Sequence, residues 1–479
     1  MIIKKTIINY FFLIASLFIY SDLFSKEQDT SFYFLSFYDN FEKHSRDEFL
    51  LFFSQRKRQY SENLISLTFN QENLNYLRQF DYHHKMTSSF KYKLMINDVN
   101  NFFYFKGAYL YELRKKQKYL IEYSTYDFAP FYFADTTIGT IIFEKYNFAF
   151  GYGRKFDNTA FAAAIDYSAI DGMKKKYSFS ISSGREINLN SELVCNLDEC
   201  QIHFFYHYKD YVENINTKDR NLVSVENKLY RGSRYFLTFR GQNNYYKNRS
   251  MASSFVSEFH ANNFISLQHN IIFAYTIEKL YSIIPNQNFI EHNDGIACIQ
   301  KYSFIYKNNY NLFDNLDLEL IINENKIKSW SSINLNEKIK VAILEQNFNE
   351  RNFGIILSSI FNKISKVNIQ GGFSYANIDS FYYINSILMN YKEPSIYLST
   401  NLEYNFTQNI VGYLLLKYDN IKNDFYNFLK RNWSLEIIFG CLKNLESKKN
   451  IDFTIIYNYI KINDKRKIDK ISLMLLYYY

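Results

Sequence analysis

The sequence predicts an all-β protein, a closed antiparallel transmembrane β-barrel of roughly 14 to 16 strands. Three observations support this fold class: repeated segments that alternate apolar and polar residues, many aromatic residues without a long apolar run, and a last strand that ends on an aromatic residue. Because strand side chains point alternately to two faces, such alternation predicts a sheet with one apolar and one polar face.

The first residues have the features of a secretory signal peptide, which we expect over residues 1–25. Lys4 and Lys5 precede an apolar run from Ile7 to Tyr20. That run is shorter than the about 20 residues that a membrane-spanning helix needs. The alternative is an N-terminal helix that stays in the membrane.

The rest of the chain reads as one domain. Residues 26–60 alternate poorly, and we expect either an N-terminal extension or the first strand there. Residues 61–479 carry the barrel pattern, with no Pro-rich or Gly-rich linker and no repeat of fixed period. One outer-membrane-type barrel over residues 61–479 is therefore the simplest organisation.

Period-two alternation is clearest in five segments, residues 144–153, 160–169, 367–376, 396–406 and 451–459. In the first, Tyr146, Phe148 and Phe150 share one face. Several segments extend over about 9–11 residues, the length of a tilted strand that crosses a bilayer. Strands of a soluble sandwich are usually about 5–6 residues long. A strand in lipid cannot leave an open edge, so we expect the sheet to close.

The polar faces of these strands supply the candidate site. We expect them to line the lumen, with Lys145, Asn147, Asp166, Asn368, Gln370, Asn401 and Glu403. Such a lining suits either a hydrated channel or an interior filled by paired polar groups.

Composition excludes some classes. The chain is 47% hydrophobic and 20% aromatic, yet residues 26–479 contain no run of 18 apolar residues, which excludes a helical membrane protein. The net charge of +8 comes from basic clusters between the alternating segments, which we interpret as solvated turns. Nucleic-acid binding would need a basic face on a recognisable module, and the sequence predicts none.

The final segment, Ile471 to Tyr479, places Leu473, Leu475, Tyr477 and Tyr479 on one face. An apolar terminal strand that ends on an aromatic residue resembles the membrane-insertion signal read by the barrel-assembly machinery of Gram-negative bacteria. The alternative is a buried last strand of a soluble sheet. We expect an exported protein of the outer membrane, with lipid and the assembly machinery as partners.

A stretch of roughly 50 residues carries a more specific resemblance, and the rest of the chain agrees only in general character. Pro130, Ala134-Asp135-Thr136 and Glu144-x-Tyr146, followed by the glycine-containing strand to Gly153, resemble a family of outer-membrane β-barrels of unknown function from Bacteroidetes. The Ala-rich segment from Ala160 also fits. Ile138-Gly139 replaces part of the family's Gly pair, and its Pro-containing turn is missing. The resemblance implies the outer membrane and a barrel, and it implies no reaction.

No motif for catalysis, a cofactor or a metal is found, so we expect no enzyme activity and no cofactor. His203 and His207 share a strand face but lie about 13 Å apart, so we expect no metal site there. Cys195 and Cys200 form either a disulfide or two free thiols.

The leading function is passive or accessory transport of small solutes. The alternatives are a non-conducting surface or scaffold barrel that binds a partner through its loops and, less favoured, a hydrolase embedded in a barrel. The sequence identifies no substrate, no exact strand count and no oligomeric state.

Overall fold

The computed structural model describes residues 60–74, 84–97, 100–120, 134–175, 179–197, 200–218, 226–229, 237–240, 245–264, 267–285, 291–313, 316–336, 339–361, 365–383, 387–407, 410–420, 433–446, 449–461 and 467–478. These residues form β1 (Tyr60–Leu74), β2 (His84–Asn97), β3 (Asn101–Leu120), β4 (Ala134–Lys155), β5 (Thr159–Lys175), β6 (Phe179–Asn196), β7 (Cys200–Lys218), β8 (Glu226–Leu229), β9 (Leu237–Arg240), β10 (Tyr245–Phe264), β11 (Leu267–Pro285), β12 (Glu291–Phe313), β13 (Leu316–Asn336), β14 (Ile339–Phe361), β15 (Ser365–Tyr382), β16 (Ile387–Thr407), β17 (Ile410–Asn420), β18 (Trp433–Glu446), β19 (Lys449–Lys461) and β20 (Lys467–Tyr478). Within them, no helix is long and apolar enough to cross a bilayer.

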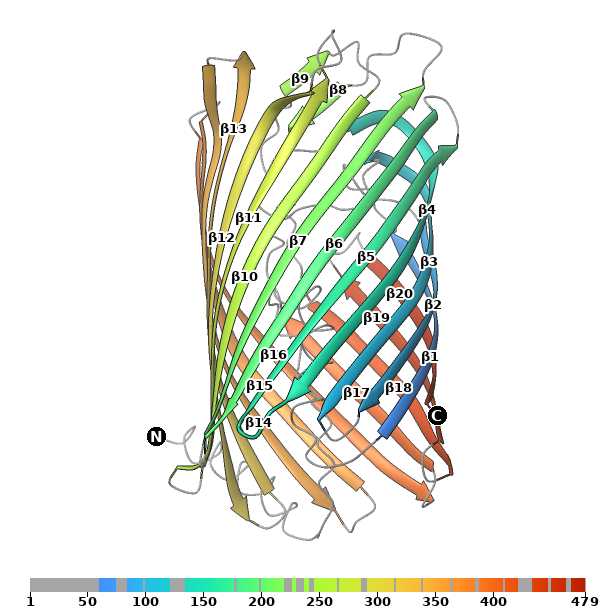
Figure 1. Ribbon diagram of the computed structural model, residues 1–479, viewed down its shortest axis with the longest axis vertical. Coiled ribbons are helices and arrows are strands. Elements are labelled where there is room, and N and C mark those ends of the chain that lie inside the picture. The colour runs from blue at the N-terminus through green and yellow to red at the C-terminus, as the bar shows by residue number, and fades with distance from the viewer. Residues whose placement is uncertain are drawn as a thin grey trace, which may run out of the picture.

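The main sheet closes on itself (Figure 1). It contains 18 strands, each antiparallel to its neighbours in chain order, and β7 pairs with β10 across the segment that carries β8 and β9. β1 pairs with both β2 and β20, so that Leu67 lies opposite Leu475 and Phe69 opposite Leu473. Each of the 18 strands therefore has two neighbours, and the sheet is a barrel.

The two ends of the barrel differ in their connections. At one end, the connections contain two or three residues: 98–100, 156–158, 197–199, 265–266, 314–315, 362–364, 408–409 and 447–448. At the other end, they include the longer segments 75–83, 121–133, 219–244 and 421–432. We call these the short-turn end and the long-loop end. The hairpin of β8 and β9 lies at the long-loop end, at the top of Figure 1.

The outer face of the barrel carries an exposed apolar band. On β4, it consists of Tyr146, Phe148, Phe150 and Tyr152. The next outward positions on that strand are the charged Glu144 and Arg154. Exposed large apolar side chains also lie on neighbouring and more distant strands, among them Phe161, Ile165 and Tyr167 on β5, Phe204 and Tyr206 on β7, and Phe353 and Ile355 on β14. The band lies in the half of these strands nearer the short-turn end.

Beyond this band, toward the long-loop end, charged residues join the exposed apolar side chains of the outer face, such as Met173, Ile181 and Trp330. Lys326 and Arg351 both contact Glu324 there, with nitrogen–oxygen distances of 3.2 Å in each pair. The side chains of Lys326 and Arg351 are 51% and 68% exposed. The strands are thus longer than the apolar band that they carry.

The inner face contains apolar clusters as well as polar groups. Phe102 and Tyr104 of β3 pack with Ala149, Ala160, Ala162 and Val194 of β4, β5 and β6. Gly151 lies beside this cluster, and a Cβ there would come within 3.0 Å of the Ala164 Cβ and 3.4 Å of the Tyr104 ring. The small residues of β4 and β5 therefore make room for aromatic side chains of β3.

The all-β closed barrel predicted from the sequence is confirmed, and all five clearly alternating segments lie in strands. The expected strand count of roughly 14 to 16 is too low, since the sheet has 18 strands. Residues 1–25 and 26–59 lie outside the described residues, while Tyr60 is the first residue of β1.

Candidate functional site: the inner polar face

The candidate site is the inner face of the wall formed by β3 to β7. In β4, Tyr146, Phe148 and Phe150 are exposed, whereas Ala149 is 5% exposed. Asn147 lies between two exposed aromatic positions and points to the opposite face. The same alternation in β5 places Asp166 inward, between the exposed Ile165 and Tyr167. The polar residues of each strand thus face the interior because its apolar residues face outward.

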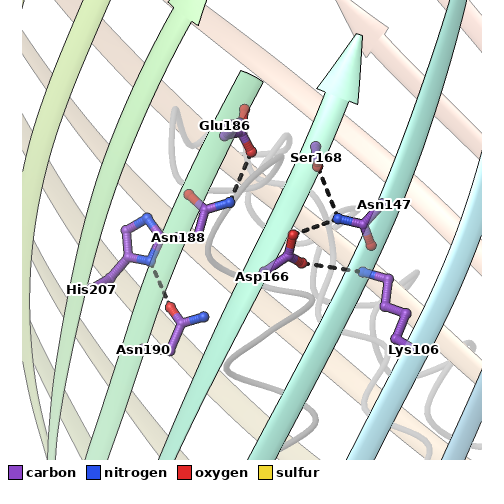
Figure 2. Close-up of polar contacts among 8 residues, drawn as sticks. All are labelled: Lys106, Asn147, Asp166, Ser168, Glu186, Asn188, Asn190 and His207. Atoms are coloured by element: carbon purple, nitrogen blue, oxygen red, sulfur yellow. Dashed lines mark hydrogen bonds and ion pairs between the residues drawn. The ribbon is translucent and has the colours of Figure 1, made fainter. Parts of the chain in front are cut away.

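Three strands meet around Asp166 (Figure 2). The amide nitrogen of Asn147 donates hydrogen bonds to the Asp166 carboxylate and, at 2.9 Å, to the Ser168 hydroxyl. The Lys106 ammonium of β3 lies 3.9 Å from Asp166 Oδ2. Lys106 and Asp166 are both largely shielded, with 18% and 19% of their side chains exposed. The group is therefore an ion pair between Lys106 and Asp166, whose carboxylate also accepts a hydrogen bond from the Asn147 amide.

The polar face continues onto β6 and β7 (Figure 2). Asn188 donates to Glu186 at 2.8 Å, and His207 Nδ1 lies 2.6 Å from the Asn190 side-chain oxygen. Each of these four residues is at most 6% exposed. Polar groups removed from water in this way need partners. Asn188 pairs with Glu186 within β6, whereas His207 of β7 pairs with Asn190 of β6.

A second group lies closer to the short-turn end and joins β6, β7, β10 and β11. Glu192 Oε1 lies 3.1 Å from His203 Nδ1, and the His203 ring packs edge-on against His260 at 5.3 Å between centroids. His260 Nε2 lies 3.0 Å from Glu258, which also accepts a 3.0 Å hydrogen bond from Asn270. His203 thus pairs with His260 of β10, the neighbour of β7 in the sheet, and not with His207.

Closer to the long-loop end, further buried carboxylates accept hydrogen bonds from other side chains of the inner face. Glu213 is fully buried and accepts hydrogen bonds from the hydroxyls of Ser182 and Tyr211, the latter at 2.6 Å. Glu278 accepts a 2.7 Å bond from Ser250 and lies 3.5 Å from the Lys301 ammonium. These serine hydroxyls are bound to carboxylates, which is not the serine–histidine arrangement that nucleophilic hydrolysis uses.

The predicted lumen residues divide into two groups. Lys145, Asn147 and Asp166 lie together on β4 and β5. Asn368 and Gln370 lie on β15, in another part of the wall, and are 5% and 1% exposed. Asn401 and Glu403 of β16 lie opposite Asn368 and Lys366 in the backbone register, and their side chains are outside the described residues.

The predicted insertion-signal residues lie at the seam where the barrel closes. Leu473 and Leu475 of β20 are 38% and 40% exposed on the outer face. Tyr477 is paired with Ile65 of β1 in the backbone register, but its side chain is outside the described residues. Tyr479 lies outside them altogether. The two described side chains thus extend the outer apolar band across the seam.

Several polar residues of this face were not predicted, including Lys106, Glu186, Asn190, Glu213 and His207. In β3, the face that carries Lys106 also carries Glu112 and Arg114, whereas Phe103 and Phe105 lie on the other face, and this pattern would have identified Lys106 as an inward residue. Nothing in the sequence pairs His203 with His260, because residues 219–244 separate their strands.

Some deeply buried polar atoms of the inner face have no hydrogen-bond partner in the structure. They include the Asn188 and Asn368 amide oxygens and both polar atoms of the Gln370 side chain.

Among the described residues, no group of three or more His, Cys, Asp or Glu side chains forms a metal site. Cys195 and Cys200 flank the turn at residues 197–199 as free thiols.

These faces define the class of protein as a closed antiparallel β-barrel with an apolar outside and a polar inside. No protein-family model and no curated protein matches the chain. The barrel is similar to three solved structures, each sharing 8% identity. These are the siderophore receptor PirA from Acinetobacter baumannii (TM-score 0.44), the outer membrane transporter YddB from Escherichia coli (0.43) and BauA, the ferric preacinetobactin receptor from A. baumannii (0.41). The matches cover 88–89% of this chain and 81% of those chains.

Proposed function

We propose that this chain is an outer-membrane β-barrel that passes small polar solutes through its interior. The carrying observation is the pairing of β1 with β20, which closes 18 strands with exposed aromatic residues outside and polar residues inside. Barrels of about 16–18 strands are wide enough to leave an aqueous channel. An apolar outer face and a polar inner face are the arrangement of a barrel in lipid.

The asymmetry of the ends supports an orientation. Outer-membrane barrels have short periplasmic turns and longer extracellular loops. The apolar band lies near the short-turn end, and the polar outer surface around Glu324 and Arg351 lies beyond it. In this arrangement, the long-loop half projects outside the cell and the short-turn end faces the periplasm.

Export and assembly belong to the same proposal. Residues 1–25 act as the signal peptide, and the assembly machinery reads Leu473, Leu475, Tyr477 and Tyr479. Lipid is then the permanent partner of the outer band.

Solute passage is tested by single-channel recording of the refolded protein, with an Asp166→Lys variant as the probe of the path. We expect steady conductance and a shift of the reversal potential toward anion selectivity in the variant, because charges in a pore act on ions at short range. The matched control is Asp171→Lys on the outer face of the same strand, which we expect to leave selectivity unchanged. A folded barrel that stays silent would contradict passage.

A second candidate is a closed, non-conducting barrel that binds a partner through its loops. The burial of the inner face favours it, since Glu213 and Ser250 are 0% exposed and Gln370 is 1% exposed. In that case, Asp166→Lys would lower stability without any current, because it places two cations, Lys106 and the new lysine, together in a shielded site.

A further inference from the structure

A basic groove lies on the outer face of β6, β7 and β10, away from the inner polar site. It has a volume of about 430 Å³ and is lined by Ser183, Gly184, Arg185, Val212, Asn214, Lys247 and Arg249. Three of these lining residues are cationic and none is anionic. The groove is therefore a local concentration of positive charge on the outer face.

The register of the three strands explains the groove. Val212 of β7 lies directly between Arg185 of β6 and Arg249 of β10. One outer-face position closer to the long-loop end, Asn214 lies between Ser183 and Lys247. Val212 is 6% exposed although it points outward, which is consistent with the two flanking arginine side chains covering it. Val212 is the floor of the groove, and the cations are its rims.

One cation of the groove is held in place by a carboxylate. Arg249 donates through Nε and one terminal nitrogen to the two oxygens of Asp210, at 3.0 Å each. Its guanidinium is thereby oriented along the outer wall. Asp171 of β5 lies opposite Ser183 at the edge of the groove. Among the described residues, the two carboxylates of Asp210 and Asp171 are thus set against three cations.

The groove lies at the border of the apolar band. On β6, Arg185 is the next outward position after Ile187, and Leu189 further along is 43% exposed. On β7, the exposed Phe204 and Tyr206 precede the groove on the side of the short-turn end. Cations at this height meet the headgroup layer of whatever lipid covers the band.

We propose that this groove binds the phosphate of a lipid headgroup in the leaflet at the long-loop end, an inference that rests on the proposed membrane location. The guanidinium fork of Arg185 matches phosphate oxygens, and Lys247 adds a point charge. The apolar side chains below the groove contact the acyl chains of the same lipid, which favours a lipid over free phosphate.

The test is native mass spectrometry of the full-length barrel in detergent, titrated with diphosphoryl lipid A, with its dephosphorylated form and with inorganic phosphate. The variant is the double substitution Arg185→Gln and Lys247→Gln. The matched control is Lys326→Gln with Lys328→Gln, which removes the same charge from β13 outside the groove. We expect the groove variant to bind diphosphoryl lipid A at least about tenfold more weakly, the loss of roughly one charge-assisted contact, and the control to bind like wild type.

Equal binding by the groove variant, or equal binding of the dephosphorylated lipid, would overturn the proposal. Displacement of lipid A by equimolar inorganic phosphate would make it a free-phosphate site and would also overturn it. Heat-modifiable migration of each variant on gels verifies folding. Membrane fractionation of the same variants separates the two proposals, since a barrel that reaches the outer membrane without a groove effect rejects only the groove.

Discussion

Phe150 tests the outer face at the scale of one residue. Its side chain is 54% exposed at the centre of the band on β4. If lipid covers it, Phe150→Arg should reduce the free energy of unfolding by about 2–4 kcal/mol, whereas Tyr152→Arg at the margin should cost about 0–1 kcal/mol. Refolding titrations in lipid vesicles measure both. Near-neutral effects at both positions would mean that water covers this face.

Glu213 provides the corresponding test of the inner face. Glu213→Ala leaves the buried hydroxyls of Ser182 and Tyr211 without their acceptor, at a cost of about 1–3 kcal/mol for each. The control is Glu345→Ala on the outer face, which removes a 3.0 Å bond from the exposed Tyr383. We expect that control to change the free energy of unfolding by less than about 0.5 kcal/mol. Similar losses in both variants would show that Glu213 is solvated.

At the scale of elements, the pairing of β1 with β20 decides whether the sheet closes. In a background without native cysteines, Leu67→Cys with Leu475→Cys should form a disulfide on mild oxidation, because these residues lie directly opposite. Cysteines at Leu67 and Met474 should not, since adjacent strand residues point to opposite faces. Gel mobility with and without reductant reports the bond. Cross-linking of the second pair alone would show that the register between β1 and β20 differs by one residue from the one described.

The sequence predicts some elements better than others, for a physical reason. β4 and β5 alternate cleanly because one face meets apolar surroundings, and their inward residues Asn147 and Asp166 follow from that pattern. β13 and β14 extend beyond the band, so polar residues such as Asn323 and Glu324 occupy both faces and the alternation disappears. This explains the underestimated strand count. The contact of His203 with His260 depends on the pairing of β7 with β10 across residues 219–244, which no local pattern predicts.

For the whole molecule, the central claim is a closed barrel whose aromatic band lies in lipid. Spin labels placed singly at residues 144–154 of the reconstituted protein test it through their accessibility to oxygen and to a water-soluble nickel complex. We predict high oxygen and low nickel accessibility at 148 and 150, rising nickel accessibility at 144 and 154, and a period of two throughout. Nickel reaching 148 and 150 as readily as 144 and 154 would contradict the account.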